Sequence, residues 1–365
     1  MDKKFVMGIA AMAALTLVSC SSDDLDSLSD NSSKNEAISF DGYLGRSAVA
    51  VNGSRASELT KNALQNSTEG FGVFGNYSST DGTTPAYGES LFKNQKVFYS
   101  DSKWTYTPLR FWPEQGHIDF LAYAPYDATA TLKKKNATET ALTCIDFKVE
   151  KTVAGQKDLL YAKADGKKKD NISSTGNKVK FHFYHALSRL GYTVKLYGDY
   201  ASNNVKFILN KITLAGSAPE SATKAFYTGG TIDLSTGNWT LKDATKQDFD
   251  WLSVPYENLS TTASNPDPDK NYLFVIPQDF SQTGNTLYVI VEYTIKYTDG
   301  GALSITNTVY KKLTTNFKEG KAYTLNLTIG LPIEFDVDVV EDWKAPDDGT
   351  GDINIGSNDN PWDRK

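Results

Sequence analysis

The stretch Leu287-Tyr288-Val289-Ile290-Val291-Glu292-Tyr293-Thr294-Ile295-Lys296-Tyr297 decides the fold class of this chain. Its odd positions carry Leu, Val, Val, Tyr and Ile, whereas its even positions add Tyr, Ile, Glu, Thr and Lys. An alternation of period two is typical of a β-strand with one buried face. Asp299-Gly300 follows and predicts a turn into a second strand over residues 303–310, so the pair is predicted to form a β-hairpin.

Similar patterns recur from residue 37 to residue 340. Short runs rich in Tyr, Phe, Thr and Val alternate with Gly, Asn and Asp turns, and only residues 57–66 have a helical spacing of apolar residues. We therefore predict an all-β fold of antiparallel sandwiches. Predicted strands include residues 71–77, 96–99, 104–106, 117–126, 145–149, 159–162, 179–185, 192–196, 207–215, 230–234, 239–241, 272–276, 321–329 and 333–340.

The N-terminus has the layout of a secretory signal. Two lysines precede an apolar run over residues 5–18, which is too short for an ordinary membrane-spanning helix. Leu17-Val18-Ser19-Cys20 closes the run and resembles a bacterial lipobox, in which cleavage leaves the Cys as a lipidated first residue. The sequence predicts a signal peptide over residues 1–19 and lipidation at Cys20, with a plain signal peptide and a chance Cys as the alternative.

The segment after Cys20 is rich in Ser and Asp. Such composition cannot bury a core, so residues 20–36 are predicted to be a flexible tether. The acidic pair Asp23-Asp24 resembles the surface-export signal of lipoproteins in some Gram-negative anaerobes. We therefore expect an outer-membrane protein that faces the cell surface.

Length and charge bound the remaining possibilities. The chain has 365 residues and a net charge of −6 that is spread along it, which argues against a nucleic-acid partner. The length favours two domains, and the polar stretch over residues 165–171 is the best boundary. The predicted parts are an N-terminal sandwich (37–165), a C-terminal sandwich (166–330) and a C-terminal appendage with a tail (331–365).

Few residues point to chemistry. With Cys20 lipidated, Cys144 has no disulfide partner and is predicted to be buried. His182 and His185 leave opposite faces of their strand, which suits a shared metal poorly, and His117 stands alone. No nucleophile, phosphate-binding or zinc motif occurs, and the acidic residues after position 333 alternate as on one face of a strand. We predict no catalytic residue, no metal site and no cofactor.

Several segments occur in an order that resembles a known family. The lipobox and Ile38-Ser39-Phe40 come first, followed by Phe111-Trp112-Pro113 and Phe120-Leu121-Ala122-Tyr123-Ala124-Pro125-Tyr126. Asp158-Leu159-Leu160-Tyr161-Ala162 and Phe183-Tyr184-His185-Ala186-Leu187-Ser188-Arg189-Leu190 come later. Together they are similar to the fimbrillin-like pilin family of Gram-negative anaerobes.

The resemblance implies a fold and an assembly mechanism. Members have two transthyretin-like antiparallel β-sandwich domains in tandem after a lipoprotein signal peptide. They reach the surface as lipoproteins, and an arginine-specific protease removes the first strand. A C-terminal strand of the next pilin subunit then fills the groove that remains, which is strand addition.

The resemblance assigns these roles to particular residues. Ile38 and Phe40 belong to the released strand, and Arg55 occupies the processed position, with Arg46 as its rival. An exposed Arg in a loop is usually only solvated, which is the alternative for both. The candidate donor strand, or the strand before it, carries Ile333, Phe335, Val337 and Val339; a closing strand of the second domain is the alternative.

The leading hypothesis is a structural pilus subunit without catalysis, lipid-anchored in the outer membrane and then part of a pilus that supports adhesion. Its position as shaft, tip or anchor stays open. The alternative is a surface lipoprotein that binds glycans through exposed aromatic residues and does not polymerise, with Trp104, Trp239 and Trp251 as candidates. A hydrolase ranks third, because no carboxylate pair stands out.

Overall fold

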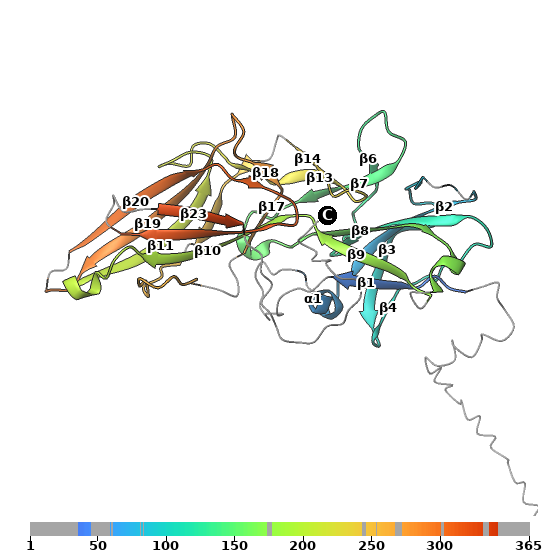
Figure 1. The fold of residues 1–365 in the computed structure, drawn as a ribbon, viewed down its shortest axis with the longest axis horizontal. Coiled ribbons are helices and arrows are strands. Elements are labelled where there is room, and N and C mark those ends of the chain that lie inside the picture. Colours follow the sequence, from blue (N-terminus) through green and yellow to red (C-terminus); the bar gives the residue numbers. More distant parts are fainter. Residues whose placement is uncertain are drawn as a thin grey trace, which may run out of the picture.

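The computed structural model describes residues 36–44, 59, 61–80, 82, 84–173, 177–242, 246–252, 254–266, 272–300, 303–330 and 336–341. The predicted signal peptide, Cys20, Arg46, Arg55, Ile333 and Phe335 lie outside these residues. A search of the described residues finds no helix with the length and apolar character needed to cross a membrane. The described part is elongated and nearly all β-structure (Figure 1).

One end of the molecule is built on a seven-stranded sheet in the order β1-β9-β8-β5-β2-β3-β4. β1 pairs with β9 in parallel, whereas the other neighbours are antiparallel. A short helix, α1 (Lys61–Asn66), buries Leu64 against the same core and lies within the predicted helical stretch. The strands are β1 (Phe40–Leu44), β2 (Phe71–Ser78), β3 (Phe92–Ser100), β4 (Lys103–Thr105), β5 (His117–Ala124), β8 (Leu160–Lys167) and β9 (Val179–His185).

A four-stranded sheet packs against the outer face of this sheet, in the order β14-β13-β7-β6. Tyr123 of β5 shares a buried cluster with Ile145 of β7 and Ile232 of β13. Because both faces of β5 are covered, all eight of its residues are buried. The strands are β6 (Lys133–Lys134), β7 (Leu142–Lys148), β13 (Gly229–Asp233) and β14 (Trp239–Leu241).

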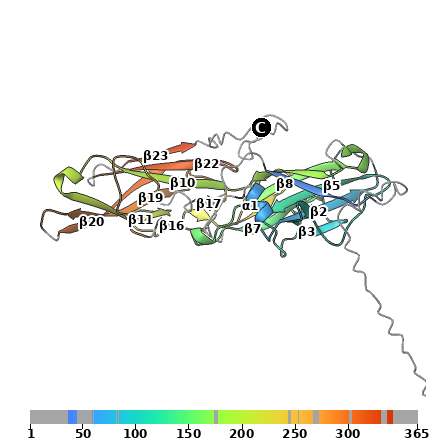
Figure 2. The ribbon, with the colours of Figure 1, turned by 90° about the horizontal axis from the view of Figure 1, so that it is seen from below.

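The other end is a sandwich of two four-stranded sheets, seen as two layers in Figure 2. One layer runs β17-β10-β22-β23 and the other β16-β11-β19-β20. Their strands are β10 (Ser188–Leu196), β11 (Val205–Ala215), β16 (Phe249–Leu252), β17 (Leu273–Val275), β19 (Leu287–Tyr297), β20 (Ser304–Leu313), β22 (Ala322–Ile329) and β23 (Asp336–Glu341). The smaller elements are β12 (Phe226–Tyr227), β15 (Lys246–Gln247), β18 (Gln278–Asp279), β21 (Asn316–Phe317) and three 3-10 turns, η3 (Val153–Gly155), η4 (Lys169–Asn171) and η6 (Ala201–Asn203).

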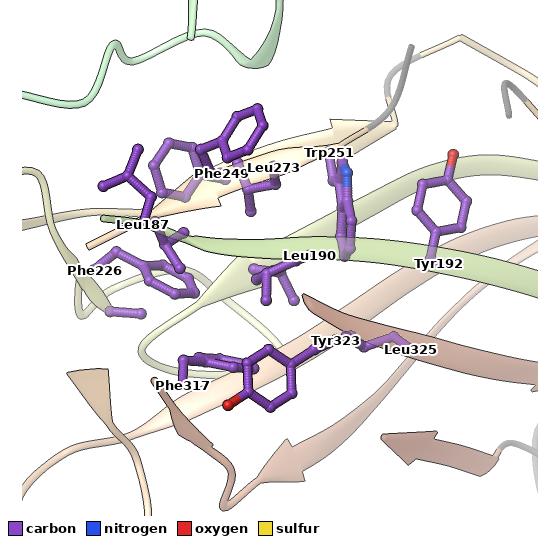
Figure 3. Close-up of a cluster of buried hydrophobic side chains, with 14 of the residues drawn as sticks. Leu187, Leu190, Tyr192, Phe226, Phe249, Trp251, Leu273, Phe317, Tyr323 and Leu325 are labelled. Carbon is purple, nitrogen blue, oxygen red and sulfur yellow. The ribbon is translucent and has the colours of Figure 1, made fainter. Parts of the chain in front are cut away.

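The core of this sandwich follows from alternation along its strands. Tyr192 of β10 packs against Trp251 of β16 with a ring-centroid distance of 4.9 Å, and Leu190, Phe249 and Leu325 belong to the same buried cluster (Figure 3). The odd-numbered residues of β19 are all buried down to position 295, and β20 returns antiparallel to it. The predicted all-β fold and the predicted hairpin are therefore confirmed.

Strand pairing corrects the placement of two predicted segments. Residues 179–185, expected to open the C-terminal sandwich, form β9 and pair with β8 and β1 in the first sheet. Residues 165–167, expected in a linker, continue β8, and Lys167 pairs with Ile118. They are polar because this end of β8 is only partly buried. β7 also pairs with β13, so the predicted boundary at residue 165 does not separate sheets.

The free thiol of Cys144 is buried in β7, as predicted. Burial also raises its pKa, which disfavours the reactive thiolate.

Glu319, which lies between β21 and β22, is expected to make the stability of the two-layer sandwich depend on pH. Burial raises the pKa of its carboxyl from the ordinary 4.5 to about 7. Because the pKa is higher in the folded state than in the unfolded state, the folded protein holds this proton more tightly. The resulting contribution to the free energy of unfolding is fully present below the unfolded pKa and is lost as the pH rises through about 7. We expect the melting temperature to fall from about pH 5 to about pH 8, and less so in Glu319→Gln. Thermal unfolding of both proteins at the two pH values tests this, with exposed Glu114→Gln as the control. An equal fall in wild type and Glu319→Gln would contradict it.

Candidate functional site

The segment over residues 36–44 joins two parts of the first sheet. On one side, the N–H of Ile38 donates to the carbonyl of Arg110 at 2.8 Å. On the other side, the N–H of Val179 donates to the carbonyl of Ser39 at 2.8 Å, and β1 continues parallel to β9. One extended segment therefore closes the space between β9 and the loop that carries Arg110.

Alternate side chains of this segment point into an aromatic pocket. Ile38 is 1% exposed and Phe40 is 3% exposed. The Phe40 ring centroid lies 5.4 to 5.7 Å from four other rings, mostly in edge or tilted contacts that favour aromatic pairs. We call the buried aromatic residues around the first strand the cradle; they are Phe71, Phe92, Trp104, Tyr106, Phe120, Phe181 and Phe183.

Tyr106 also fixes the backbone of the first strand. Its hydroxyl donates to the carbonyl of Ile38 at 2.7 Å. Burial raises the pKa of Tyr106, so the hydroxyl keeps the proton that it donates. The segment is thus held by main-chain bonds on both sides, by side-chain hydrogen bonds that include those of Tyr106 and Ser39, and by apolar contacts.

Gly42 continues the inward-facing row. A β-carbon added there would lie 3.4 Å from Phe183 and 3.7 Å from Phe71 and Trp104. β1 and β4 are the two edges of the seven-stranded sheet, and the closeness of Trp104 brings these edges together. The sheet therefore curls around the first strand.

The chain is anchored again at residue 59. The N–H of Leu59 donates to Oδ2 of Asp158 at 3.1 Å, and Nδ1 of His185 lies 2.6 Å from the same oxygen. The side chains of Asp158 and His185 are fully buried. His185 thus has the structural role expected of it, and Leu59 is held independently of β1.

The described part of the predicted donor strand is β23. It pairs antiparallel with β22 at the edge of its sheet. Val337 is 5% exposed and Val339 is half-buried, while Asp336 and Asp338 are exposed, so the predicted acidic face is present. In this state β23 is a closing strand, which is the alternative left open by the sequence. Donation to another subunit stays a prediction.

The three tryptophans considered for glycan binding do not form an exposed cluster. Trp104 belongs to the cradle and Trp251 to the core of the sandwich. Trp239 is half-buried, and its Nε1–H donates to the carbonyl of Ala186 at 2.8 Å. The exposed cluster that the glycan-binding alternative requires is not formed by these three residues, because they face the interiors of the sheets.

Groups for chemistry are sparse. No cluster of three or more His, Cys, Asp or Glu residues suited to a metal occurs among the described residues. His117 lies 3.2 Å from the buried carboxylate of Asp119, which also accepts the N–H of Ala86 and the N–H of Gly166. This carboxylate ties the loop at Ala86 and the end of β8 to β5, which is a structural role.

The residues of the cradle lie inside a stretch that matches a known family, and the first strand precedes that stretch. A sequence model described as fimbrillin-like matches residues 54–343. The chain belongs to the fimbrillin-like family. It is 29% identical over 391 aligned residues to the fimbrium subunit Fim1C of Phocaeicola vulgatus. The alignment covers 95% of this chain and 98% of that protein. The family predicted from the sequence is confirmed.

A solved structure has the same fold. The crystal structure of a fimbrial protein from Bacteroides vulgatus superposes with a TM-score of 0.65 at 21% identity. The match covers 84% of this chain and 99% of that one. The β-sandwich fold expected of a fimbrillin-like protein is therefore present.

Several cradle residues were not predicted. The sequence singles out Ile38 and Phe40 but gives no role to Phe92 or Tyr106, which follow them by more than fifty positions. The alternation of Phe181 and Phe183 was visible, yet the partner strand could not be read from it. Only the fold brings these rings around Phe40.

Truncation of Phe40 is expected to destabilise the first sheet strongly. Phe40→Ala removes a ring from a closed cluster and should lower the free energy of unfolding by about 3–5 kcal/mol. Phe111→Ala is the matched control, since Phe111 lies on the neighbouring loop and is 50% exposed; we expect a change within about 1 kcal/mol. Urea unfolding followed by tryptophan fluorescence measures both. Equal effects would show that the cradle does not hold this strand.

Proposed function

We propose that the chain is a structural subunit of a fimbrium, without catalysis of its own, that is exported as an outer-membrane surface lipoprotein. An arginine-specific protease then releases the first strand, and a C-terminal strand of the next subunit replaces it. The resulting fimbrium supports adhesion. The proposal rests on the observation that residues 36–44 fill the cradle and pair with β9.

The position of two arginines explains why a single cut matters. Arg46 and Arg55 are the arginines between β1 and Leu59. After cleavage at either one, β1 stays with the protein through non-covalent contacts alone. Leu59 keeps its bond to Asp158 in both cases, so the chain from Leu59 onward stays anchored after the cut.

Loss of the first strand leaves two surfaces that favour the binding of another strand. It uncovers the aromatic rings of the cradle and the unpaired edge of β9. An exposed apolar patch and an open sheet edge both favour binding of another extended segment. A strand with alternating apolar residues satisfies both at once.

Cleavage is tested on the purified chain lacking residues 1–20. We expect an arginine-specific protease to give a new N-terminus at Ala56 or at Ser47, together with an SDS-resistant ladder on unboiled gels. N-terminal sequencing identifies the bond. Arg55→Ala and Arg46→Ala, made separately and together, show which arginine is required.

The double variant is the decisive control. It should keep residues 36–44 and stay monomeric under the same treatment. A ladder formed without any cut between residues 44 and 59 would contradict protease-triggered exchange. A cut that leaves the first strand bound at all temperatures below unfolding would contradict it as well.

Lipidation is tested in cells. Cys20→Ala removes the thiol that would carry the lipid, so we expect loss of palmitate labelling and release of the chain from the outer-membrane fraction. Cys144→Ala is the control, because its thiol is buried in the folded protein. Unchanged labelling in Cys20→Ala would refute lipid anchoring at this residue.

A further inference from the structure

A groove runs across the outer face of the sheet β16-β11-β19-β20, beside the residues that lead into η3. We infer that this groove binds a short neutral oligosaccharide, with a sugar ring on Tyr310 and sugar hydroxyls donating to the carboxylate of Glu292. Such a site gives the proposed adhesion its class of ligand, so its biological role rests on the proposed function.

The floor of the groove is built from side chains that point away from the core of the sandwich. The odd-numbered residues of β19 face that core, so Ile290 and Glu292 lie on the outer face. Strand pairing places Ile290 opposite Tyr310 of β20 and opposite Thr213 of β11. Thr213 is paired in turn with Asp250 of β16. Because neighbouring strands lie about 4.8 Å apart, this row across four strands spans about 14 Å, which suits an extended ligand.

A second row beside the first carries hydrogen-bonding groups. Glu292 is paired with Lys211 of β11 on one side and with Thr308 of β20 on the other. Nζ of Lys211 lies 2.9 Å from Oδ1 of Asp250, and the hydroxyl of Thr213 donates to the same oxygen at 3.0 Å. Among the described residues, neither the carboxylate of Glu292 nor the hydroxyl of Thr308 has a hydrogen-bond partner. Both groups are therefore available to a ligand that brings its own hydroxyls.

Tyr310 provides an aromatic platform at the end of the first row. Its side chain is 48% exposed, whereas Ile290 beside it is buried although it faces outward. The ring centroid of Tyr310 lies 6.2 Å from that of Tyr288 in an edge contact, which restricts the orientation of the ring. An exposed aromatic face next to an apolar floor suits the C–H face of a sugar ring, while the hydroxyls of that sugar point toward the second row.

The walls of the groove are fixed in place by the fold. One wall is the loop over residues 217–224, and Oδ1 of Asp248 accepts the N–H of Gly216 at 3.2 Å and the N–H of Ala225 at 2.9 Å, one on each side of that loop. The other wall is residues 151–154, which come from the connection between β7 and β8. The walls enclose about 890 Å³, within the range of about 300–1,000 Å³ that is typical of small-molecule sites.

The charge of the groove selects among ligand classes. Its described lining has three ammonium groups and three carboxylates, so neither an anion nor a cation is favoured overall. An apolar ligand would leave these groups and the lining hydroxyls without partners. A neutral ligand with many hydroxyls can donate to the carboxylates and accept from the ammonium groups, which indicates a sugar. The charged residues are Lys151, Lys211, Lys224, Asp248, Asp250 and Glu292.

Binding is tested with the uncleaved chain lacking residues 1–20, labelled with a fluorophore and applied to immobilised oligosaccharides. The array carries neutral fragments of mucin glycans and of bacterial polysaccharides, which distinguishes these two sources, beside sialylated and sulfated fragments. We expect binding to neutral members. Titration calorimetry with the best neutral fragment in solution then gives the dissociation constant.

Two variants locate the site. Tyr310→Ala removes the platform and Glu292→Gln removes the charged acceptor while it keeps the shape of the side chain, so each should weaken binding about tenfold or more. Tyr197→Ala is the matched control for the first, because Tyr197 is 66% exposed and lies outside the groove. Exposed Glu114→Gln is the control for the second. Both controls should bind within about twofold of the unaltered chain, and thermal unfolding verifies that all four variants are folded.

The outcomes separate this inference from the proposed function. Binding of a neutral fragment that both groove variants weaken and both controls retain supports the inference. Unchanged binding in either folded groove variant overturns it, because the sugar then lies elsewhere. Absence of binding to every neutral fragment, or a preference for the charged ones, overturns it as well. The uncleaved monomer is used throughout, so these outcomes leave strand exchange untouched, and failure of strand exchange shows only in the protease experiment.

Discussion

The burial of Phe40 among aromatic rings from four separate parts of the chain is the interaction on which the first sheet depends. Its partners come from β3, the loop after β4, β5 and β9, so one side chain links segments that are far apart in sequence. The sheet curls because its two edges meet around this strand, and Trp104 approaches Gly42 from the far edge. Without the strand, its apolar contacts no longer hold the two edges together, and the aromatic rings are exposed to water.

This design places much of the stability of the seven-stranded sheet in one short segment, residues 36–44. Burial of Ile38 and Phe40 contributes roughly 1.5–3 kcal/mol each, which is a large part of the margin of an ordinary domain. The remainder of the fold does not depend on the segment in the same way, since α1 packs through Leu64 and Leu59 is held by Asp158. The structure therefore concentrates the cost of losing β1 at the cradle.

Much of the fold was visible in the sequence because most strands of the sandwich bury one face. The alternation in β19 gave the strand, its buried side and its hairpin partner. β5 was also predicted as a strand, with Ile118, Phe120 and Ala122 on one buried face, but the burial of both of its faces was not predicted. The pairing of β9 with β1 could not be predicted, since a parallel contact between segments some 140 residues apart leaves no local signal. For the same reason Ile38 and Phe40 were identified as one strand, but the residues that receive them were not.

The cradle and β23 lie in different halves of an elongated molecule, and this separation bears on the proposed assembly (Figure 1). A surface that binds a copy of itself gives a closed dimer, whereas two different complementary surfaces join subunits head to tail. In the proposed exchange the cradle and the C-terminal strand are two such different surfaces, so subunits would join head to tail. The first strand fills the cradle of the single chain, so in the proposed exchange the segment that completes the monomer's fold would also block polymerisation until it is removed.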